Sequence, residues 1–256
     1  MALISSNTLF HFTSSLENLV GILTHEFRPR LSVESFRHIL QHLPGAAQIP
    51  EAGIPMVCFC DIPLSQVSTH MDHYGSYGIG LSKTWGISKG ISPVIYIHEN
   101  SPAPHSAAHL IALLDGLHAT NASDDFKTLA ITSGQLIYFL KPYTGILTRL
   151  GKPPRQVRFY DEREWRYLPA EIESIPALSA EDLQDPVKSR GALDQVNQLP
   201  ALSFEPRDIN YIIVRHNNEL LPMYRALRTI KAKYEEPEKD LLVTKLVSAQ
   251  QIMEDF

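Results

Sequence analysis

Residues 57–83, VCFCDIPLSQVSTHMDHYGSYGIGLSK, constrain the fold more than any other stretch of the chain. Residues 57–60 are apolar and are followed by aspartate and proline, which predicts a short buried strand that ends there. Residues 64–73 predict one helix, because apolar side chains recur at i, i+3 and i+7. The stretch therefore predicts a buried strand that is followed closely by a helix.

A glycine turn and a second strand complete this stretch. Gly75 and Gly78 interrupt the helical spacing, and glycine adopts backbone angles that other residues resist. Residues 79–83 predict a strand whose glycine permits close approach by a ligand or by another backbone. Two tyrosines and two histidines lie between the strands, which indicates one wall of a binding site. A tight structural corner packed with aromatic residues explains the pattern equally well.

The composition describes an ordinary globular protein. The chain has 256 residues, enough for one large domain spanning residues 1–256. Its hydrophobic fraction of 44% is typical of folded proteins, and its net charge of -5 gives no general attraction to nucleic acid. The start of the chain does not resemble a signal peptide, and no segment reaches the roughly 20 apolar residues of a membrane helix. We therefore expect a soluble, cytoplasmic protein without membrane partners.

The remaining elements alternate irregularly along the chain, which predicts an α+β fold rather than a doubly wound parallel sheet. Strands are expected at residues 8–13, 93–97, 208–214 and 241–247. Helices are expected after the capping residues Ser14 and Ser15 and at residues 35–43, 107–117, 127–140 and 219–231. Loops or turns are expected at residues 44–55, 85–92, 151–155 and 234–239. Residues 171–206 are acidic and weakly periodic, which predicts an irregular insertion.

His11 and Thr13 are the first candidate binding residues. They lie on the same face of the predicted strand, since side chains alternate along a strand. Together they could hold a diol or an amide of a small ligand. From these two residues alone, a capping threonine and a hydrogen-bonded structural histidine are the favoured explanation.

A charged run near residue 164 supplies the candidate catalytic residues. Glu162, Glu164 and Arg166 alternate with Arg163 and Trp165, so the first three are expected on one strand face. Carboxylates at i and i+2 could orient a nucleophile or stabilise a cationic transition state. A solvent-exposed strand held by Glu–Arg pairs is the commoner explanation of such a run.

Metal and nucleotide motifs are weak or missing. Cys58 and Cys60 share a strand face, and His70 and His73 share a helix face, but their spacing matches no common zinc module. We expect reduced, metal-free cysteines with at least one of them buried. The sequence contains no P-loop, GxGxxG, GxSxG or HExxH motif, so it gives no support to ATP-binding, Rossmann or α/β-hydrolase proteins.

Several of these segments together resemble the AbiGi-type abortive phage-infection proteins. The segments are LFHFTSSLENLVGIL, CFCDIPLSQVSTHMDHYGSYGIGLSKTWG, SPVIYI, FYDEREWRY and FEPRDINYIIV, which span most of the chain. The resemblance implies a setting in bacterial anti-phage defence, as a toxin or as an antitoxin.

The order of the motifs is also similar to that of DarT-like ADP-ribosyltransferases. That similarity implies a mixed, mainly antiparallel fold with helical insertions and NAD as substrate, without a metal. It implies Glu164 as the catalytic acid, with Glu162 as the upstream glutamate of an ExE arrangement. The residues implied to bind NAD are His11, Thr13, Tyr74, Tyr77 and Ser82. Residues 10–13 are accordingly expected to lie beside residues 78–82.

Two functions of different classes follow. The first is an NAD-dependent ADP-ribosyltransferase-like effector that modifies a macromolecular acceptor, which could be protein, DNA or RNA. The alternative is a non-catalytic antitoxin or regulatory partner that keeps the fold for binding. Transfer of label from NAD would distinguish the enzyme from the binding partner.

Overall fold

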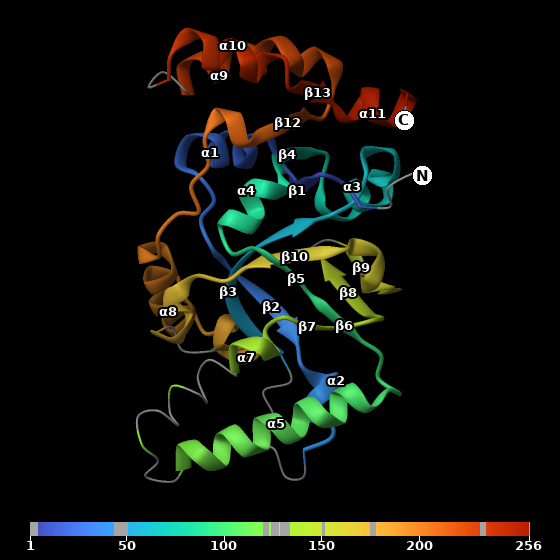
Figure 1. Ribbon diagram of the computed structural model, residues 1–256, viewed down its shortest axis with the longest axis vertical. Helices are drawn as coiled ribbons and strands as arrows, with labels where there is room; N and C mark the ends of the chain where they lie inside the picture. The colour runs from blue at the N-terminus through green and yellow to red at the C-terminus, as the bar shows by residue number, and fades with distance from the viewer. Residues whose placement is uncertain are drawn as a thin grey trace.

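A mixed sheet runs through the middle of the protein, and helices cover its ends and faces (Figure 1). The computed structural model describes residues 5–43, 51–119, 123, 128, 134–149, 152–174, 178–230 and 234–255. Within these residues, the main sheet has the strand order β13-β12-β4-β1-β3-β10-β5, and β2 and β11 pair with the first half of β3. Most of its pairs are antiparallel, while β12 and β13 are parallel. The expected α+β class with mainly antiparallel strands is confirmed.

The strands are mostly short. Those of the main sheet are β1 (Thr8–Thr13), β2 (Arg30–Ser35), β3 (Glu51–Cys60), β4 (Tyr77–Ser82), β5 (Ser92–Pro93), β10 (Glu164–Tyr167), β11 (Leu178–Ser179), β12 (Ile209–Val214) and β13 (Leu246–Ser248). Two further pairs are formed by β6 (Ile95–Ile97) with β7 (Leu140–Pro142), and by β8 (Gly145–Arg149) with β9 (Lys152–Val157).

The helices lie between these strands. The α-helices are α1 (Leu16–His25), α2 (Arg37–Leu40), α3 (Ser68–Tyr74), α4 (Lys83–Ser88), α5 (Pro102–Ala119), α7 (Ala180–Gln184), α8 (Pro186–Gln198), α9 (Leu220–Ile230), α10 (Glu236–Val243) and α11 (Ala249–Asp255). Short 3-10 helices are η1 (Leu64–Gln66), η2 (Phe159–Glu162), η3 (Ala170–Ser174), η4 (Pro206–Asp208) and η5 (Asn217–Glu219).

The N-terminal strand and helix form as the sequence predicts. The hydroxyl of Ser15 accepts a hydrogen bond from the Asn18 backbone N–H at 3.2 Å, which satisfies a donor that the first turn of α1 leaves unpaired. Leu19 and Leu23 of the same helix are fully buried. β1 pairs with β4 along its whole length, with Thr13 opposite Tyr77. The predicted neighbourhood of residues 10–13 and 78–82 is therefore confirmed.

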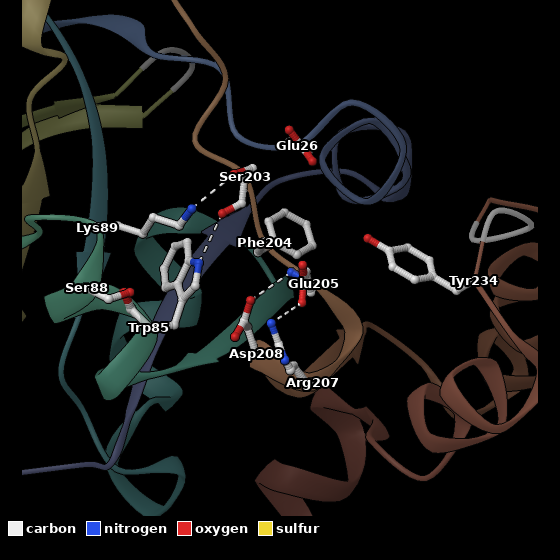
Figure 2. Close-up of a pocket in the computed structure, with 10 residues that line it drawn as sticks. All are labelled: Glu26, Trp85, Ser88, Lys89, Ser203, Phe204, Glu205, Arg207, Asp208 and Tyr234. Atoms are coloured by element: carbon white, nitrogen blue, oxygen red, sulfur yellow. Dashed lines mark hydrogen bonds and ion pairs between the residues drawn. The ribbon is translucent and has the colours of Figure 1, made fainter.

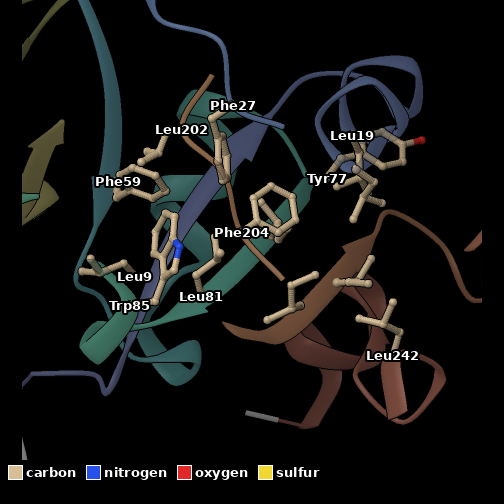
Figure 3. Close-up of a cluster of buried hydrophobic side chains, with 14 of the residues drawn as sticks. Leu9, Leu19, Phe27, Phe59, Tyr77, Leu81, Trp85, Leu202, Phe204 and Leu242 are labelled. Carbon is tan, nitrogen blue, oxygen red and sulfur yellow. The ribbon is translucent and has the colours of Figure 1, made fainter. Parts of the chain in front are cut away.

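The two faces of the main sheet carry different side chains. One face, which we call the aromatic face, carries Leu9, Phe59 and Ile79 and packs against Phe27 and Trp85 (Figure 3). The opposite face carries Phe10 and Cys60, and antiparallel pairing puts Glu164 opposite Cys60 and Arg166 opposite Cys58. Since directly opposed residues project to the same side of a sheet, Glu164 and Arg166 belong to this second face, which we call the charged face.

Several predicted loops and turns are regular structure instead. The loop predicted at residues 85–92 begins inside α4, which extends to Ser88. The Ser82 hydroxyl caps the N-terminus of that helix. Residues 44–50 of the loop predicted at 44–55 and residue 151 of the turn predicted at 151–155 lie outside the described residues, and the remainders overlap β3 and β9. The turn predicted at 234–239 overlaps α10. Glycine and proline marked these segments as irregular, but pairing with a neighbouring strand or a capping contact outweighs such local preferences.

Other predicted elements have different boundaries or a different type. The helix predicted at 64–73 is divided at Val67 into η1 and α3. Of the final strand predicted at 241–247, residues 241–243 end α10 and residues 246–247 belong to β13, since a short apolar run fits either type. Residues 171–206 are not irregular throughout, because Asp185 caps α8 and Pro186 begins it. Of the helix predicted at 127–140, residues 127 and 129–133 lie outside the described residues, residues 134–137 are helical, and β7 already begins at Leu140.

Candidate functional site

Four charged side chains meet on the charged face of the sheet. Lys141 Nζ donates to Glu162 Oε2 at 2.7 Å and also to Glu164 Oε2, while Arg166 Nε donates to Glu164 Oε1 at 2.5 Å. All four are buried, with exposed fractions of 0% for Arg166 and 6% for Glu164. We call Lys141, Glu162, Glu164 and Arg166 the charged cluster.

Further contacts complete the surroundings of Arg166. Its Nη2 donates to Glu34 Oε2 on β2 at 2.7 Å, and its Nη1 donates to the carbonyl oxygen of Tyr138 at 2.5 Å. The guanidinium therefore has two carboxylate partners and a backbone acceptor. A fully buried arginine requires such pairing, because an unpaired buried charge is costly.

A change in backbone direction brings Glu162 and Glu164 together. Glu162 ends η2, Arg163 has a left-handed φ of 45°, and β10 begins at Glu164. The carbonyl oxygen of Arg163 accepts a hydrogen bond from the Asp61 N–H at 3.0 Å, which holds this turn against the end of β3. The two glutamates therefore share Lys141, even though residue 162 is outside the strand.

Aromatic side chains surround the charged cluster. The Tyr74 hydroxyl donates to Glu162 Oε1, and the Tyr96 hydroxyl accepts a hydrogen bond from the Glu164 N–H at 2.8 Å. Lys141 Nζ lies 4.7 Å from the centre of the Phe159 ring, a distance typical of a cation–π contact. These contacts give the cluster an aromatic border beside its ion pairs.

The electrostatics of the cluster keep its charges in place. Burial by itself raises the pKa of the Glu164 carboxyl, but Lys141 and Arg166 outweigh burial and hold the pKa well below its usual range. Burial by itself lowers the pKa of Lys141, but Glu164 and Glu162 outweigh it and raise that pKa. Both groups are consequently ionised at neutral pH, and neither is suited to exchange a proton there.

Most of the residues predicted to bind NAD lie elsewhere, on the aromatic face. The His11 ring packs edge-on against Phe27, and its Nδ1 lies 2.8 Å from the carbonyl oxygen of Cys58. Burial lowers the pKa of His11. Thr13 Oγ1 accepts a hydrogen bond from the Asn18 side-chain amide at 3.0 Å. The Tyr77 hydroxyl donates to Glu219 Oε1 at 2.7 Å.

The structure therefore brings together only part of the predicted site. Tyr74, Glu162 and Glu164 meet in the charged cluster, whereas His11, Thr13 and Tyr77 lie across the sheet from it. Ser82 acts as the N-cap of α4, where its hydroxyl accepts from the Trp85 N–H at 3.2 Å. The solvent-exposed strand weighed for residues 162–166 is wrong, since Glu162, Glu164 and Arg166 are all buried.

Sequence reasoning missed Lys141 entirely. Lys141 lies in the three-residue strand β7, more than twenty positions before Glu164 by its number, and no local pattern marks it. The sequence signal for a further cation is weak: on the predicted strand face, Glu162 and Glu164 outnumber Arg166 by two to one. Lys141 is the residue that connects the two glutamates.

The structure tests part of the prediction made for the two cysteines. Cys60 is buried and Cys58 is half-buried, and both are free thiols. Burial raises the pKa of both, so the thiols are not reactive thiolates at neutral pH. Burial of at least one cysteine is confirmed. Among the described residues, no group of three histidine, cysteine or acidic side chains is placed to hold a metal ion.

Comparisons with known proteins point to one family. A protein-family model described as "Putative abortive phage resistance protein AbiGi, antitoxin" matches residues 26–215. A relative from Lactococcus lactis subsp. cremoris, named "Abortive phage resistance protein AbiGi", is 30% identical over 253 residues, which cover 90% of this chain and 99% of the relative. No solved structure matches this chain. In the described part of the chain, no helix is long and apolar enough to cross a membrane.

Proposed function

We propose that this chain, which belongs to the AbiGi family of abortive phage resistance proteins, acts as a non-catalytic binding partner of a cognate toxin. The word "antitoxin" in the description of the matching family supports this role. The proposal rests on one observation, which is that the Glu164 carboxylate is buried and paired with two cations in the charged cluster.

The negative charge of the Glu164 carboxylate is already neutralised by neighbouring cations. Its two carboxylate oxygens are bonded to Lys141 and Arg166, and its exposed fraction is 6%. A carboxylate that stabilises a developing ribosyl cation must face that cation without being neutralised by other cations. Lys141 and Arg166 would oppose such a cation, so the cluster is better suited to hold β10, β7 and β2 together.

The separation of the predicted binding residues supports the same conclusion. A ligand held by His11 and Thr13 would lie on the aromatic face, while the Glu164 carboxylate points away from that face. His11 and Thr13 are also engaged with the Cys58 carbonyl and the Asn18 amide. One small substrate would need both sets of groups on one side of the sheet.

NAD-dependent ADP-ribosyl transfer to protein, DNA or RNA is the second candidate function. One observation favours it, because Tyr74, Glu162 and Glu164 are brought into a single centre bordered by Tyr96 and Phe159. A tyrosine beside two carboxylates could bind a ribose and a nicotinamide ring if Lys141 moved away. No metal is required for that reaction.

Deletion of this gene in its native host tests the proposed function. If the chain restrains a toxin encoded beside it, removal of this gene alone should arrest growth, while removal of both genes should not. Wild-type protein and Glu164→Gln protein supplied from a plasmid should restore growth equally, provided that their melting temperatures are similar. Normal growth after deletion of this gene alone would contradict the proposal.

Incubation with labelled NAD and host or phage-infected lysate tests the second candidate. We expect neither label transfer nor nicotinamide release from the wild-type protein. The matched variants are Glu164→Gln and Glu17→Gln, the latter on the exposed first turn of α1. Turnover by the wild type and by Glu17→Gln, but not by folded Glu164→Gln, would establish the enzyme and overturn the binding role.

A further inference from the structure

A cavity of about 360 Å³ lies away from the charged cluster, between the end of α1, the end of α4 and residues 203–208 (Figure 2). Tyr234, which precedes α10, faces it from the opposite side. The cavity thus lies where the main sheet meets the C-terminal helices. Its charged lining residues are Glu26, Lys89, Glu205, Arg207 and Asp208.

One wall of the cavity is firmly held. Trp85 Nε1 donates to the carbonyl oxygen of Ser203 at 3.1 Å, and Lys89 Nζ donates to the Ser203 hydroxyl at 3.1 Å. Trp85 and Phe204 are buried in the aromatic core beneath this wall. The segment that leads into η4 is consequently fixed to α4, so the cavity is built on rigid elements.

Glu26 contributes an unusual backbone conformation to the cavity. It is the C-cap of α1 with φ 66° and ψ -178°, a combination that is essentially restricted to glycine. A glycine here would avoid the strain, yet the chain has a glutamate. Among the residues that the structure describes, the Glu26 carboxylate has no hydrogen-bond or ion-pair partner. Strain of this kind is often retained where the side chain has a role in binding.

The charged lining residues of the cavity are three acidic and two basic, so their net charge is a single negative one. Arg207 pairs with Glu205 at 2.7 Å, whereas Lys89 donates to the neutral Ser203 hydroxyl and keeps its positive charge. One oxygen of Asp208 accepts the Glu205 N–H at 2.8 Å. Lys245, whose Nζ donates to the Pro206 carbonyl oxygen at 2.9 Å, balances part of the Asp208 charge. Among the acidic lining residues, Glu26 is the one whose carboxylate has no partner in the described part of the chain.

We propose that this cavity binds an arginine side chain from an exposed basic segment of the partner protein, an inference that rests on the proposed function. A guanidinium can form two parallel hydrogen bonds with the carboxylate of Glu26, and its flat face can lie against the ring of Tyr234. A cavity of about 360 Å³ can accommodate one long side chain. The net charge of -5 on this chain also favours association with a basic segment.

Binding of a small probe tests this cavity without the partner. N-acetyl-arginine amide should bind the full-length protein, and its neutral isostere N-acetyl-citrulline amide should not, as followed by titration in NMR. Glu26→Gln should weaken binding of the arginine probe about tenfold or more, as expected for loss of a charged hydrogen bond. Glu17→Gln, on the first turn of the same helix, should bind like the wild type.

Glu26→Gly provides a second, independent readout. Because the backbone conformation of residue 26 suits glycine, this variant should melt about 2–4 °C higher than the wild type while it loses the probe. Equal binding of arginine and citrulline probes, or unchanged binding by Glu26→Gln, would overturn the inference. The deletion experiment does not use the probe. If the arginine probe does not bind, the proposed role as a toxin partner is still tested by the deletion experiment.

Discussion

The two faces of the main sheet are stabilised in different ways. On the aromatic face, Phe27, Phe59 and Trp85 pack with ring centres 5.2 to 6.3 Å apart, and His11 adds one hydrogen bond to a backbone carbonyl. On the charged face, Lys141 and Arg166 connect carboxylates from different elements. Apolar packing is non-directional and shared among many atoms, whereas each buried ion depends on a few matched partners. Loss of one partner should therefore affect the charged face more.

Replacement of Arg166 should have the largest effect. Arg166→Met fills a similar space but leaves Glu164 with one cation instead of two and leaves Glu34 without its arginine. We expect the free energy of unfolding to fall by about 3–5 kcal/mol, as found when one member of a buried ion pair is removed. Urea unfolding followed by circular dichroism measures the change.

Arg207→Met is the matched control for that substitution. Arg207 also pairs with a glutamate, but its side chain is 77% exposed, so water already screens the interaction. Its removal should leave the free energy of unfolding almost unchanged. Equal losses from Arg166→Met and Arg207→Met would remove the distinction between the buried cluster and an ordinary surface pair.

Two nearby tyrosines allow the faces to be compared with one type of substitution. Tyr74 donates to the buried Glu162 on the charged face, and Tyr77 donates to the half-buried Glu219 on the aromatic face. We expect Tyr74→Phe to cost about 1.5–3 kcal/mol, as for hydrogen bonds to charged groups, and Tyr77→Phe to cost less because water can replace its hydroxyl. Thermal melting of both variants should rank them in that order, and the reverse order would show that Glu162 is adequately satisfied by Lys141 alone.

The two faces should also respond to acid in different pH ranges. Because burial lowers the pKa of His11, the unfolded chain binds a proton below about pH 6.5 that the folded chain does not. Stability should consequently fall as the pH decreases below about 6.5, by about 1.4 kcal/mol per pH unit for this one group. Burial lowers the pKa of His38 to about 4, so His38 adds a second contribution over the same range.

Protonation of Glu164 should affect the stability only at lower pH. Its pKa is depressed in the folded state, so the stability it contributes is present above its unfolded pKa of about 4.5 and is lost as the pH falls further. His11→Gln should therefore flatten the dependence of unfolding free energy on pH between about 6.5 and 5, measured by urea unfolding at several pH values. An unchanged slope in His11→Gln would show that His11 accepts its proton without loss of the fold.

Local sequence was sufficient where short-range contacts decide the structure. The strand at residues 8–13, the helix capped by Ser15, the strand near residues 208–214 and the helix near residues 219–231 form close to their predicted positions. Each has a regular apolar spacing or a capping side chain within a few residues, and these signals need no distant partner. The family resemblance rested on segments such as LFHFTSSLENLVGIL and FEPRDINYIIV, and it agrees with the comparisons.

Only the tertiary structure decided which of the candidate residues meet. Alternation along a strand placed Glu164 and Arg166 on one side, but it could not show that His11 and Thr13 face the opposite side. It also could not supply Lys141, which is distant in sequence and turns two candidate catalytic acids into members of a buried ion-pair network. Strand order and register bring distant residues together through long-range hydrogen bonds, so the sequence determined the chemical groups and the fold determined which of them neutralise one another.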